Sequence, residues 1–260
     1  MGVIDEQDTA TGCTTVYWTE DFAHWRDITP PEVAGPEGRL PPGECSYIWQ
    51  SASFVSADDG WVLGRDGGGT DTVLFHTLDG GRTWSREPGG ATGSNAGYEV
   101  IGFANPALGW RQAFATGSNR PYTLELTRDA GASWSLLPSV DVRGGCELVP
   151  VVFAGPRVGF AADPMTAGGL LAPWVWRTTN GGASWSHMTV ARPSWLEGAS
   201  ALYGQPQFFA AVGVLPVLFT KRSSTWLGFC RSTDRGLNWH LQAVVVTRGD
   251  LSPGAGTGTC

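Results

Sequence analysis

The fold is decided by a short stretch that the chain repeats, Thr77-Leu78-Asp79-Gly80-Gly81-Arg82-Thr83-Trp84. Three further copies occupy residues 127–134, 178–185 and 232–239, and a shorter, degenerate copy occupies residues 19–25. Each full copy, called a box below, has the form Ser/Thr-x-Asp-x-Gly-x-Ser/Thr-Trp, with Asn180 and Asn238 as mild departures. The residues expected to define the boxes are Asp21 and Trp25 in the degenerate copy, and Asp79, Gly81, Trp84, Asp129, Gly131, Trp134, Asn180, Gly182, Trp185, Asp234, Gly236 and Trp239 in the full copies.

The chemistry of the box predicts a turn. An Asp or Asn side chain accepts hydrogen bonds from backbone N–H groups a residue or two ahead, which closes a turn. The Gly two residues later reaches a positive φ without steric cost. The following Ser or Thr begins an extended segment, and the Trp anchors that segment in apolar packing. We therefore expect a hairpin turn with a buried Trp at its foot, which stabilises the fold rather than touching a substrate.

The spacing of the boxes predicts the architecture. Their Asp or Asn falls at residues 21, 79, 129, 180 and 234, so the intervals are 58, 50, 51 and 54 residues. A period of about 50 residues is typical of a four-stranded propeller blade rather than of a helical repeat. Almost no helix is expected, because no segment has a sustained 3.6-residue apolar period.

A second recurrent piece precedes the first three full boxes. It is a strand that ends in Phe, a tight turn, and a Gly-aromatic pair that opens the next strand. The copies run over residues 53–64, 102–110 and 152–162. The corresponding part of the last unit, residues 206–219, keeps the composition of a strand but has lost this form.

These patterns predict one all-β domain over residues 1–260, a β-propeller with four full four-stranded antiparallel blades and one partial blade. The expected units are residues 14–29 for the partial blade, 47–90, 98–140, 148–192 and 205–247 for the full blades, and 248–260 for a tail. Two alternatives stay open at this point: the termini pair to close the ring, or the chain is a fragment of a larger propeller.

Charge and cysteine content narrow the function. The net charge of −7 argues against a nucleic-acid binder. No apolar run is long enough to span a bilayer. The five cysteines form no CxxC pair, so neither a zinc site nor any other metal or cofactor is expected. They are Cys13, Cys45, Cys146, Cys230 and Cys260.

The compartment is indicated in two opposing ways. The scarcity of Lys and the abundance of Trp and Gly suit an exported protein, in which Cys13 and Cys45, on either side of the degenerate box, are predicted to form a disulfide. The start of the chain, residues 1–5, has neither the basic nor the apolar region of a signal peptide.

The pairing of Phe-x(5,6)-Gly-Trp with a downstream box resembles the photosystem II stability/assembly-factor-like propellers and their bacterial relatives of the Asp-box, or bacterial neuraminidase repeat, type. The likeness covers residues 45–190 well, and Phe54 through Trp84 is the closest match. It implies a seven-bladed, non-enzymatic ring that binds proteins during membrane-complex assembly. This chain is short of seven blades.

Enzymatic alternatives lack their residue patterns. A sialidase needs an Arg triad, a Tyr–Glu nucleophile pair and an acid, and the Phe/Tyr-Arg-Ile-Pro signature of that class does not occur. A glycosidase needs two carboxylates, but the acids crowded in the first full blade lie beside Gly in turns. These acids are Asp58, Asp59, Asp66 and Asp71. The four His residues, at 24, 76, 187 and 240, show no metal-ligand spacing.

The sequence therefore predicts a non-enzymatic scaffold that binds another protein, whose identity it does not indicate. The alternatives are a sialidase-like or other carbohydrate-active enzyme and a lectin-like extracellular module. A binding surface is predicted from Arg residues near strand ends, which suit an acidic partner, and from one aromatic in the loop 192–196. These residues are Arg65, Arg111, Arg157, Arg177 and Trp195. The competing interpretation is that the Arg residues are solvated strand ends and that Trp195 is tucked into the ring.

Overall fold

The structure of the chain is a computed structural model that describes residues 2–7, 14–30, 47–66, 72–90, 96–115, 123–137, 151–163, 174–188, 190–191, 193–209 and 211–246. These residues form strands and two single-turn 3-10 helices, η1 (Pro88–Gly90) and η2 (Ser194–Leu196), with no α-helix among them. The prediction of an all-β fold is confirmed. The chain forms two compact units, Met1–Leu136 and Leu137–Cys260, and each is described by itself.

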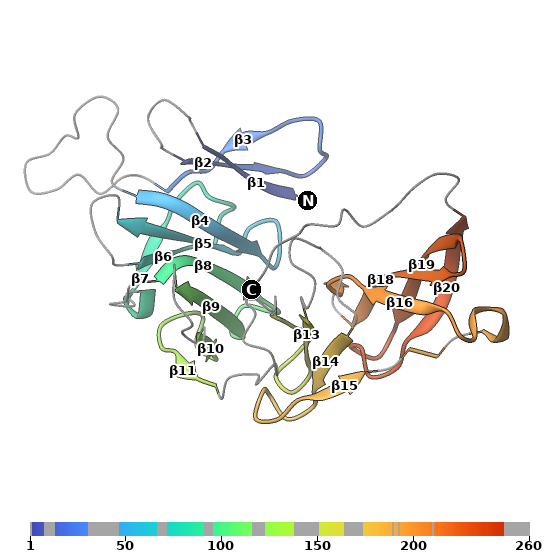
Figure 1. The fold of residues 1–260 in the computed structure, drawn as a ribbon. Helices are drawn as coiled ribbons and strands as arrows, with labels where there is room; N and C mark the ends of the chain where they lie inside the picture. The colour runs from blue at the N-terminus through green and yellow to red at the C-terminus, as the bar shows by residue number, and fades with distance from the viewer. Residues whose placement is uncertain are drawn as a thin grey trace, which may run out of the picture. The chain divides into compact units, whose positions relative to one another are not determined.

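The first unit contains three antiparallel sheets in which each strand pairs with the next along the chain (Figure 1). The first sheet has three strands, β1 (Gly2–Gln7), β2 (Thr14–Thr19) and β3 (Arg26–Asp27). The second has four, β4 (Tyr47–Phe54), β5 (Gly60–Asp66), β6 (Thr72–Thr77) and β7 (Ser85–Glu87). The third also has four, β8 (Ala96–Phe103), β9 (Gly109–Ala115), β10 (Thr123–Thr127) and β11 (Ser135–Leu136).

The second unit contains two antiparallel sheets. The first consists of β12 (Val151–Phe153), β13 (Gly159–Asp163), β14 (Trp174–Thr178) and β15 (Ser186–Met188). The second consists of β16 (Ser200–Tyr203), β17 (Gln207–Phe209), β18 (Val212–Lys221), β19 (Ser224–Ser232) and β20 (His240–Val246). Four sheets of four or five strands and one of three strands match the predicted four full propeller blades and one partial blade.

All five sheets share one register. The Gly that begins the second strand of a blade pairs with the Ser or Thr that begins the box, as in Gly60–Thr77 and Gly159–Thr178. The other pairs are Gly2–Thr19, Gly109–Thr127 and Gly213–Ser232, of which Gly213 is the second residue of its strand rather than the first. Strand β1 is therefore the second strand of the partial blade, which the sequence boundaries 14–29 had left out.

The register explains why Phe precedes Gly in the second recurrent piece. Phe103 pairs directly with Gly109 across the strands, and its ring lies where a Cβ on that Gly would stand, 2.5 Å from the Cε1 atom. The pairs Phe54–Gly60, Phe153–Gly159 and Phe208–Gly213 have the same register. The last unit keeps the Phe–Gly pairing of this form, with one fewer residue between Phe208 and Gly213, but it has lost the aromatic residue after the Gly, because Val214 stands there.

The first strand of that last unit also differs from the prediction of a strand over residues 207–212. The structure splits the first-strand position into β17 and β16, both of which pair with the long strand β18. Because β18 runs over ten residues, it has room for two short partners along one edge.

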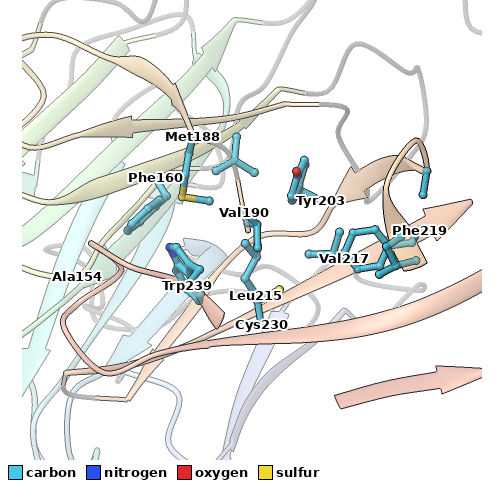
Figure 2. Packing of buried hydrophobic residues seen from close by; sticks show 13 residues of the cluster. Ala154, Phe160, Met188, Val190, Tyr203, Leu215, Val217, Phe219, Cys230 and Trp239 are labelled. Carbon is cyan, nitrogen blue, oxygen red and sulfur yellow. The ribbon is translucent and has the colours of Figure 1, made fainter. Parts of the chain in front are cut away.

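Neighbouring sheets pack through apolar side chains within each unit. In the first unit, Val16 and Trp18 of β2, together with Ile28 just after β3, pack with Trp49 and Phe75 of the next sheet. In the second unit, Figure 2 shows Phe160 and Met188 from one sheet with Trp239 and Leu215 from the other. The box Trp239 is thus part of a core between two sheets.

Candidate functional site

The box turn is closed by its Thr as well as by its Asp. The Thr77 hydroxyl oxygen accepts hydrogen bonds from the backbone N–H groups of Asp79 (3.3 Å) and Gly81 (2.8 Å), and it donates to Oδ1 of Asp79 (2.9 Å). The Asp79 carboxylate accepts from the backbone N–H of Thr83 (2.8 Å) and from the Thr83 hydroxyl (2.7 Å). The Asp79 carboxylate therefore binds a residue four positions ahead, whereas the sequence predicted bonds to N–H groups only one or two residues ahead.

The other full boxes repeat this network. Gly131, Gly182 and Gly236 donate their backbone N–H to the Ser or Thr oxygen over 2.7–2.9 Å. In the third box the amide of Asn180 replaces the carboxylate, and its Nδ2 donates to Oγ of Ser184 (2.8 Å). Asn can fill this position because its Oδ1 still accepts the backbone N–H of Ser184 (3.0 Å).

The degenerate box closes a tighter turn. Here Phe22 occupies the position that donates to the Thr oxygen, with its N–H 2.9 Å from Oγ1 of Thr19 and a φ of 60°. Asp21 accepts from the backbone of His24 (2.8 Å), three residues ahead, instead of four. The side chains of Phe22 and Trp25 are exposed, by 65% and 40%.

The box carboxylates are held in their charged form. The Thr83 hydroxyl, with its backbone N–H, lowers the pKa of Asp79 to about 2, and the Asn238 N–H lowers the pKa of Asp234 to about 2. The Ser133 hydroxyl lowers the pKa of Asp129, and the His24 side chain lowers the pKa of Asp21. Because hydrogen-bond donors surround the ionised form, these acids are poor proton donors near neutral pH.

Each box turn is also hydrogen-bonded to the turn between the first two strands of its own sheet. The backbone N–H of Gly80 donates to the carbonyl of Asp58 (2.8 Å), which lies in the turn between β4 and β5. The same bond runs from Ala130 to Ala107 (3.2 Å) and from Gly181 to Arg157 (2.9 Å). In the last sheet it runs from Arg235 to Ala211 (3.0 Å). The two recurrent pieces of the sequence therefore form one bonded corner of each blade.

The box turns meet the neighbouring sheet of the same unit. Arg26 donates from Nη2 to the carbonyl of Gly80 (2.7 Å), and the Trp61 indole donates to the carbonyl of Ala130 (2.8 Å). In the second unit, Arg177 donates from Nη1 to the carbonyl of Leu237 (2.8 Å). At Gly81, where φ is +83°, an added Cβ would stand 2.6 Å from Cβ of Ile28. The turn thus needs glycine both for its conformation and for the close approach of the next sheet.

The box Trp residues are buried to different degrees. All four were predicted to be buried: Trp239 is, with 5% of it exposed, whereas Trp84, Trp134 and Trp185 are only partly buried. These three direct the indole N–H to backbone carbonyls, those of Ile28 (3.0 Å), Gly131 (3.1 Å) and Gly182 (3.1 Å). Trp25 is the poorest copy, as predicted.

The predicted Arg surface is not a single surface. Arg111 is only 2% exposed and pairs with Glu125 through Nη2 (2.7 Å) and Nε (2.9 Å), while its guanidinium lies 4.6 Å from the Trp134 ring. Its proposed role as a surface residue is therefore wrong, because the ion pair with a neighbouring strand lets it be buried. Arg65 and Arg177 are partly buried, and Arg157 is exposed.

Trp195 is exposed on the second unit, by 49%. It lies in η2, makes an edge-to-face contact with Trp226 (5.8 Å between centroids), and its carbonyl accepts a hydrogen bond from Lys221 (3.1 Å). It borders an open groove of about 460 Å³. The groove is lined by Ala191, Pro193 and Trp195 and by residues 240–244 of β20. A groove of this volume is large enough to hold a ligand.

A histidine cluster in the first unit was missed from the sequence. His76 lies 2.9 Å from Oδ1 of Asp59 through Nε2 and 3.4 Å from Oε1 of Glu87 through Nδ1. Its ring stacks on Trp61 at 4.3 Å, and Trp61 stacks on Phe103 at 3.7 Å. No sequence pattern pointed to this cluster, since its members are spread over residues 59–103. The side chains of His76, Asp59 and Glu87 are all mostly buried, with exposures of 12%, 15% and 16%, so the cluster is part of the packing of its sheet.

The remaining candidates carry little chemistry. Asp58 is exposed in a turn; Asp71 and the side chain of Asp66 lie outside the described residues. Cys230 is buried and unpaired, and burial raises the pKa of its thiol to about 11. The predicted disulfide partners Cys13 and Cys45 also lie outside the described residues. Among the residues described, no group of His, Cys, Asp and Glu is arranged to hold a metal ion, and no helix is long and apolar enough to span a membrane.

Comparisons with known proteins find distant structural likenesses alone. No family model and no curated protein matches the chain. The chain is similar to the solved structure of YCF48 from Cyanidioschyzon merolae, with 16% sequence identity, a TM-score of 0.45, and coverage of 92% of this chain and 84% of that one. It is also similar to the fucose-specific lectin from Aleuria aurantia, with 12% identity, a TM-score of 0.40, and coverage of 94% and 78%. It is similar as well to the GH74 enzyme of Niastella koreensis, with 12% identity, a TM-score of 0.40, and coverage of 74% of this chain and 38% of that one. Likenesses this distant assign no activity to the chain.

Proposed function

We propose that the chain is a non-enzymatic scaffold built of Asp-box repeats, which binds another protein in the manner of an assembly factor. The observation that carries this proposal is the open groove of the second unit. It combines an exposed aromatic side chain, Trp195, with the edge of a strand, β20. Exposed Trp residues set in a groove are frequent anchors of protein partners.

The chemistry of the acids supports a binding role over hydrolysis. Glycoside hydrolysis needs a protonated carboxylic acid and a second carboxylate across one pocket. The carboxylate oxygens of Asp79, Asp129 and Asp234 accept hydrogen bonds within the box turns, and their lowered pKa values keep these acids ionised. Of the described residues that line the groove, none is Asp or Glu. We therefore expect the purified protein to leave glycosides intact.

The proposal can be tested by placing a photo-cross-linking amino acid at position 195 in the full chain, in its native cells. The control carries the same amino acid at position 209, because Phe209 is 69% exposed in the same unit but does not line the groove. Position 195 is expected to cross-link one or a few polypeptides that position 209 does not. A lack of any such polypeptide would contradict the proposal.

A panel of fluorogenic glycosides tests the alternative class in parallel. The carbohydrate-active interpretation would replace the scaffold if the purified protein turned over a glycoside and lost that activity when one carboxylate outside the boxes became its amide.

A further inference from the structure

We infer that the groove beside Trp195 takes an extended polypeptide strand, which pairs with the free edge of β20 and places an apolar side chain against the Trp195 ring. This inference rests on the proposed protein-binding function and names the form that the partner takes at the same site.

The first argument is the free edge itself. Strand β20 is the last strand of its sheet, and the only strand among the described residues that pairs with it is β19. In an antiparallel pair, alternate residues of an edge strand direct their N–H and C=O groups away from the partner. Such a row of backbone groups is a template for another extended chain.

The second argument is a comparison within the chain. The strand in the same position is two residues long in β3 and β11 and three residues long in β7 and β15, whereas β20 has seven residues. Short edges, charges and prolines are the usual protection against unwanted pairing. Strand β20 is long and has no Pro, Asp, Glu, Lys or Arg: its sequence is HLQAVVV, and Val245 is 52% exposed. Its register with β19 is irregular at one place, between Leu241 and Ala243, where Gln242 has no partner on β19. The one long fourth strand therefore has an edge without charged residues or Pro, and that edge is regular beyond Gln242.

The third argument is the shape of the site. Five consecutive residues of β20, His240 through Val244, line the groove, and they span about 14 Å at roughly 3.4 Å per step. A ligand that pairs with the backbone of β20 over this length must carry hydrogen-bonding groups at the spacing of a strand. The backbone of an extended polypeptide has that spacing, and a compact small molecule does not.

The fourth argument is the anchor. Trp195 is held in place on its own side, by the edge-to-face contact with Trp226 and by the hydrogen bond from Lys221 to its carbonyl. About half of its side chain stays exposed. An aromatic that is already ordered loses little conformational freedom on binding, so it suits a contact with an apolar side chain of the bound strand.

The test uses the full chain and a displayed library of random twelve-residue peptides as the probe. Peptides that bind the wild-type protein are resynthesised with single backbone N-methyl groups at successive positions. In the part of the peptide that pairs with the regular part of β20, from Ala243 on, we expect methylation at every second position to weaken binding at least tenfold. Methylation at the intervening positions should have little effect there, because alternate N–H groups pair with β20. Trp195→Ala should weaken binding roughly tenfold or more, and Phe209→Ala, at an exposed aromatic outside the groove, should not change it.

Other results would overturn the inference. Recovery of no binding peptide, N-methyl sensitivity without a two-residue period, or equal binding by Trp195→Ala would each contradict it. So would sedimentation showing that the protein is a dimer that Val245→Lys dissociates, because a second copy of β20 would then occupy the edge. If cross-linking at position 195 still captures a polypeptide in these cases, the proposed function stands and only the strand-pairing inference fails.

Discussion

Phe54 lies edge-to-face against Trp84, with 6.5 Å between the ring centroids, and the same Phe ring covers Gly60. The relationship recurs in the three other full blades. The equivalent pairs are Phe103–Trp134 at 6.3 Å, Phe153–Trp185 at 6.2 Å and Phe208–Trp239 at 5.9 Å. In each full blade, the Phe of the second recurrent piece therefore supplies the ring against which the Trp of the box packs.

This relationship predicts that the Gly beneath the Phe cannot be replaced. In Gly159→Ala the new methyl group would stand 2.8 Å from the Phe153 ring, so we expect a loss of roughly 1–3 kcal/mol in the free energy of unfolding. The matched control is Gly155→Ala in the same turn, where the nearest atom is 3.6 Å away and the change should stay within about 0.5 kcal/mol. Urea denaturation of both variants measures the difference, and equal stabilities would contradict the proposed packing.

The contribution of each box Trp to the free energy of unfolding should increase with the burial of its side chain. Trp239→Ala removes a side chain that is 5% exposed between two sheets, so we expect a loss of about 3–5 kcal/mol in stability. Trp25→Ala removes one that is 40% exposed and should cost less than about 1 kcal/mol. Trp134→Ala should fall between them. The order Trp239, Trp134, Trp25 is the result to check by denaturation, and a different order would count against burial as the cause.

Acid should weaken the boxes that carry Asp. The pKa of Asp79 is about 2 in the folded chain against an ordinary value of 3.8, so the folded state binds the proton less well than the unfolded state. Its contribution to stability is therefore full above the ordinary pKa and is lost as the pH falls toward 2. In Asp79→Asn the free energy of unfolding should fall less steeply between pH 4 and pH 2. The slope reports the number of protons taken up on unfolding, and it should decrease by up to about one proton.

The third box supplies the matched reverse experiment, because it already carries Asn180. Asn180→Asp should make the same pH dependence steeper. If neither substitution changes the slope, the box carboxylates do not drive acid unfolding.

The His76 cluster should contribute measurable coupling. Asp59 and His76 are both mostly buried, with side-chain exposures of 15% and 12%, and a charge-assisted bond in such a setting is worth about 1–2 kcal/mol. A double-mutant cycle with Asp59→Asn and His76→Phe, which keeps a ring on Trp61, isolates that coupling. The control cycle is Asp21 with His24, exposed by 53% and 89%, for which we expect a clearly smaller coupling because solvent screens the pair. Equal coupling in the two cycles would contradict the role of burial.

Local chemistry explains what the sequence could predict. A box is a turn whose Thr, Asp and Gly bond within a few residues, so its pattern alone predicts the turn, the strand after it and the blade period. Strand β1 was missed because Gly2–Gln7 has no alternation of apolar and polar residues, and only pairing with β2 orders it.

Contacts between distant residues explain what the sequence could not predict. Arg111 was expected at the surface because the sequence does not show that Glu125, on the next strand, neutralises it and that Trp134 covers it. The groove has the same origin, since Trp195 and His240 are brought to one place by the sheet and not by their spacing. Charged and aromatic residues outside a repeat can thus be placed only once the strands are paired.

The double attachment of the box turns has a consequence for how the protein unfolds. The turn at Gly80 bonds to Asp58 in its own sheet and to Arg26 in the neighbouring sheet of the same unit. If this turn unfolds, the hydrogen bond within its own sheet and the hydrogen bond to the neighbouring sheet are lost together. Within a unit, the sheets should therefore behave as a row of nearest-neighbour couplings, in which a defect weakens the adjoining blade before it reaches the next.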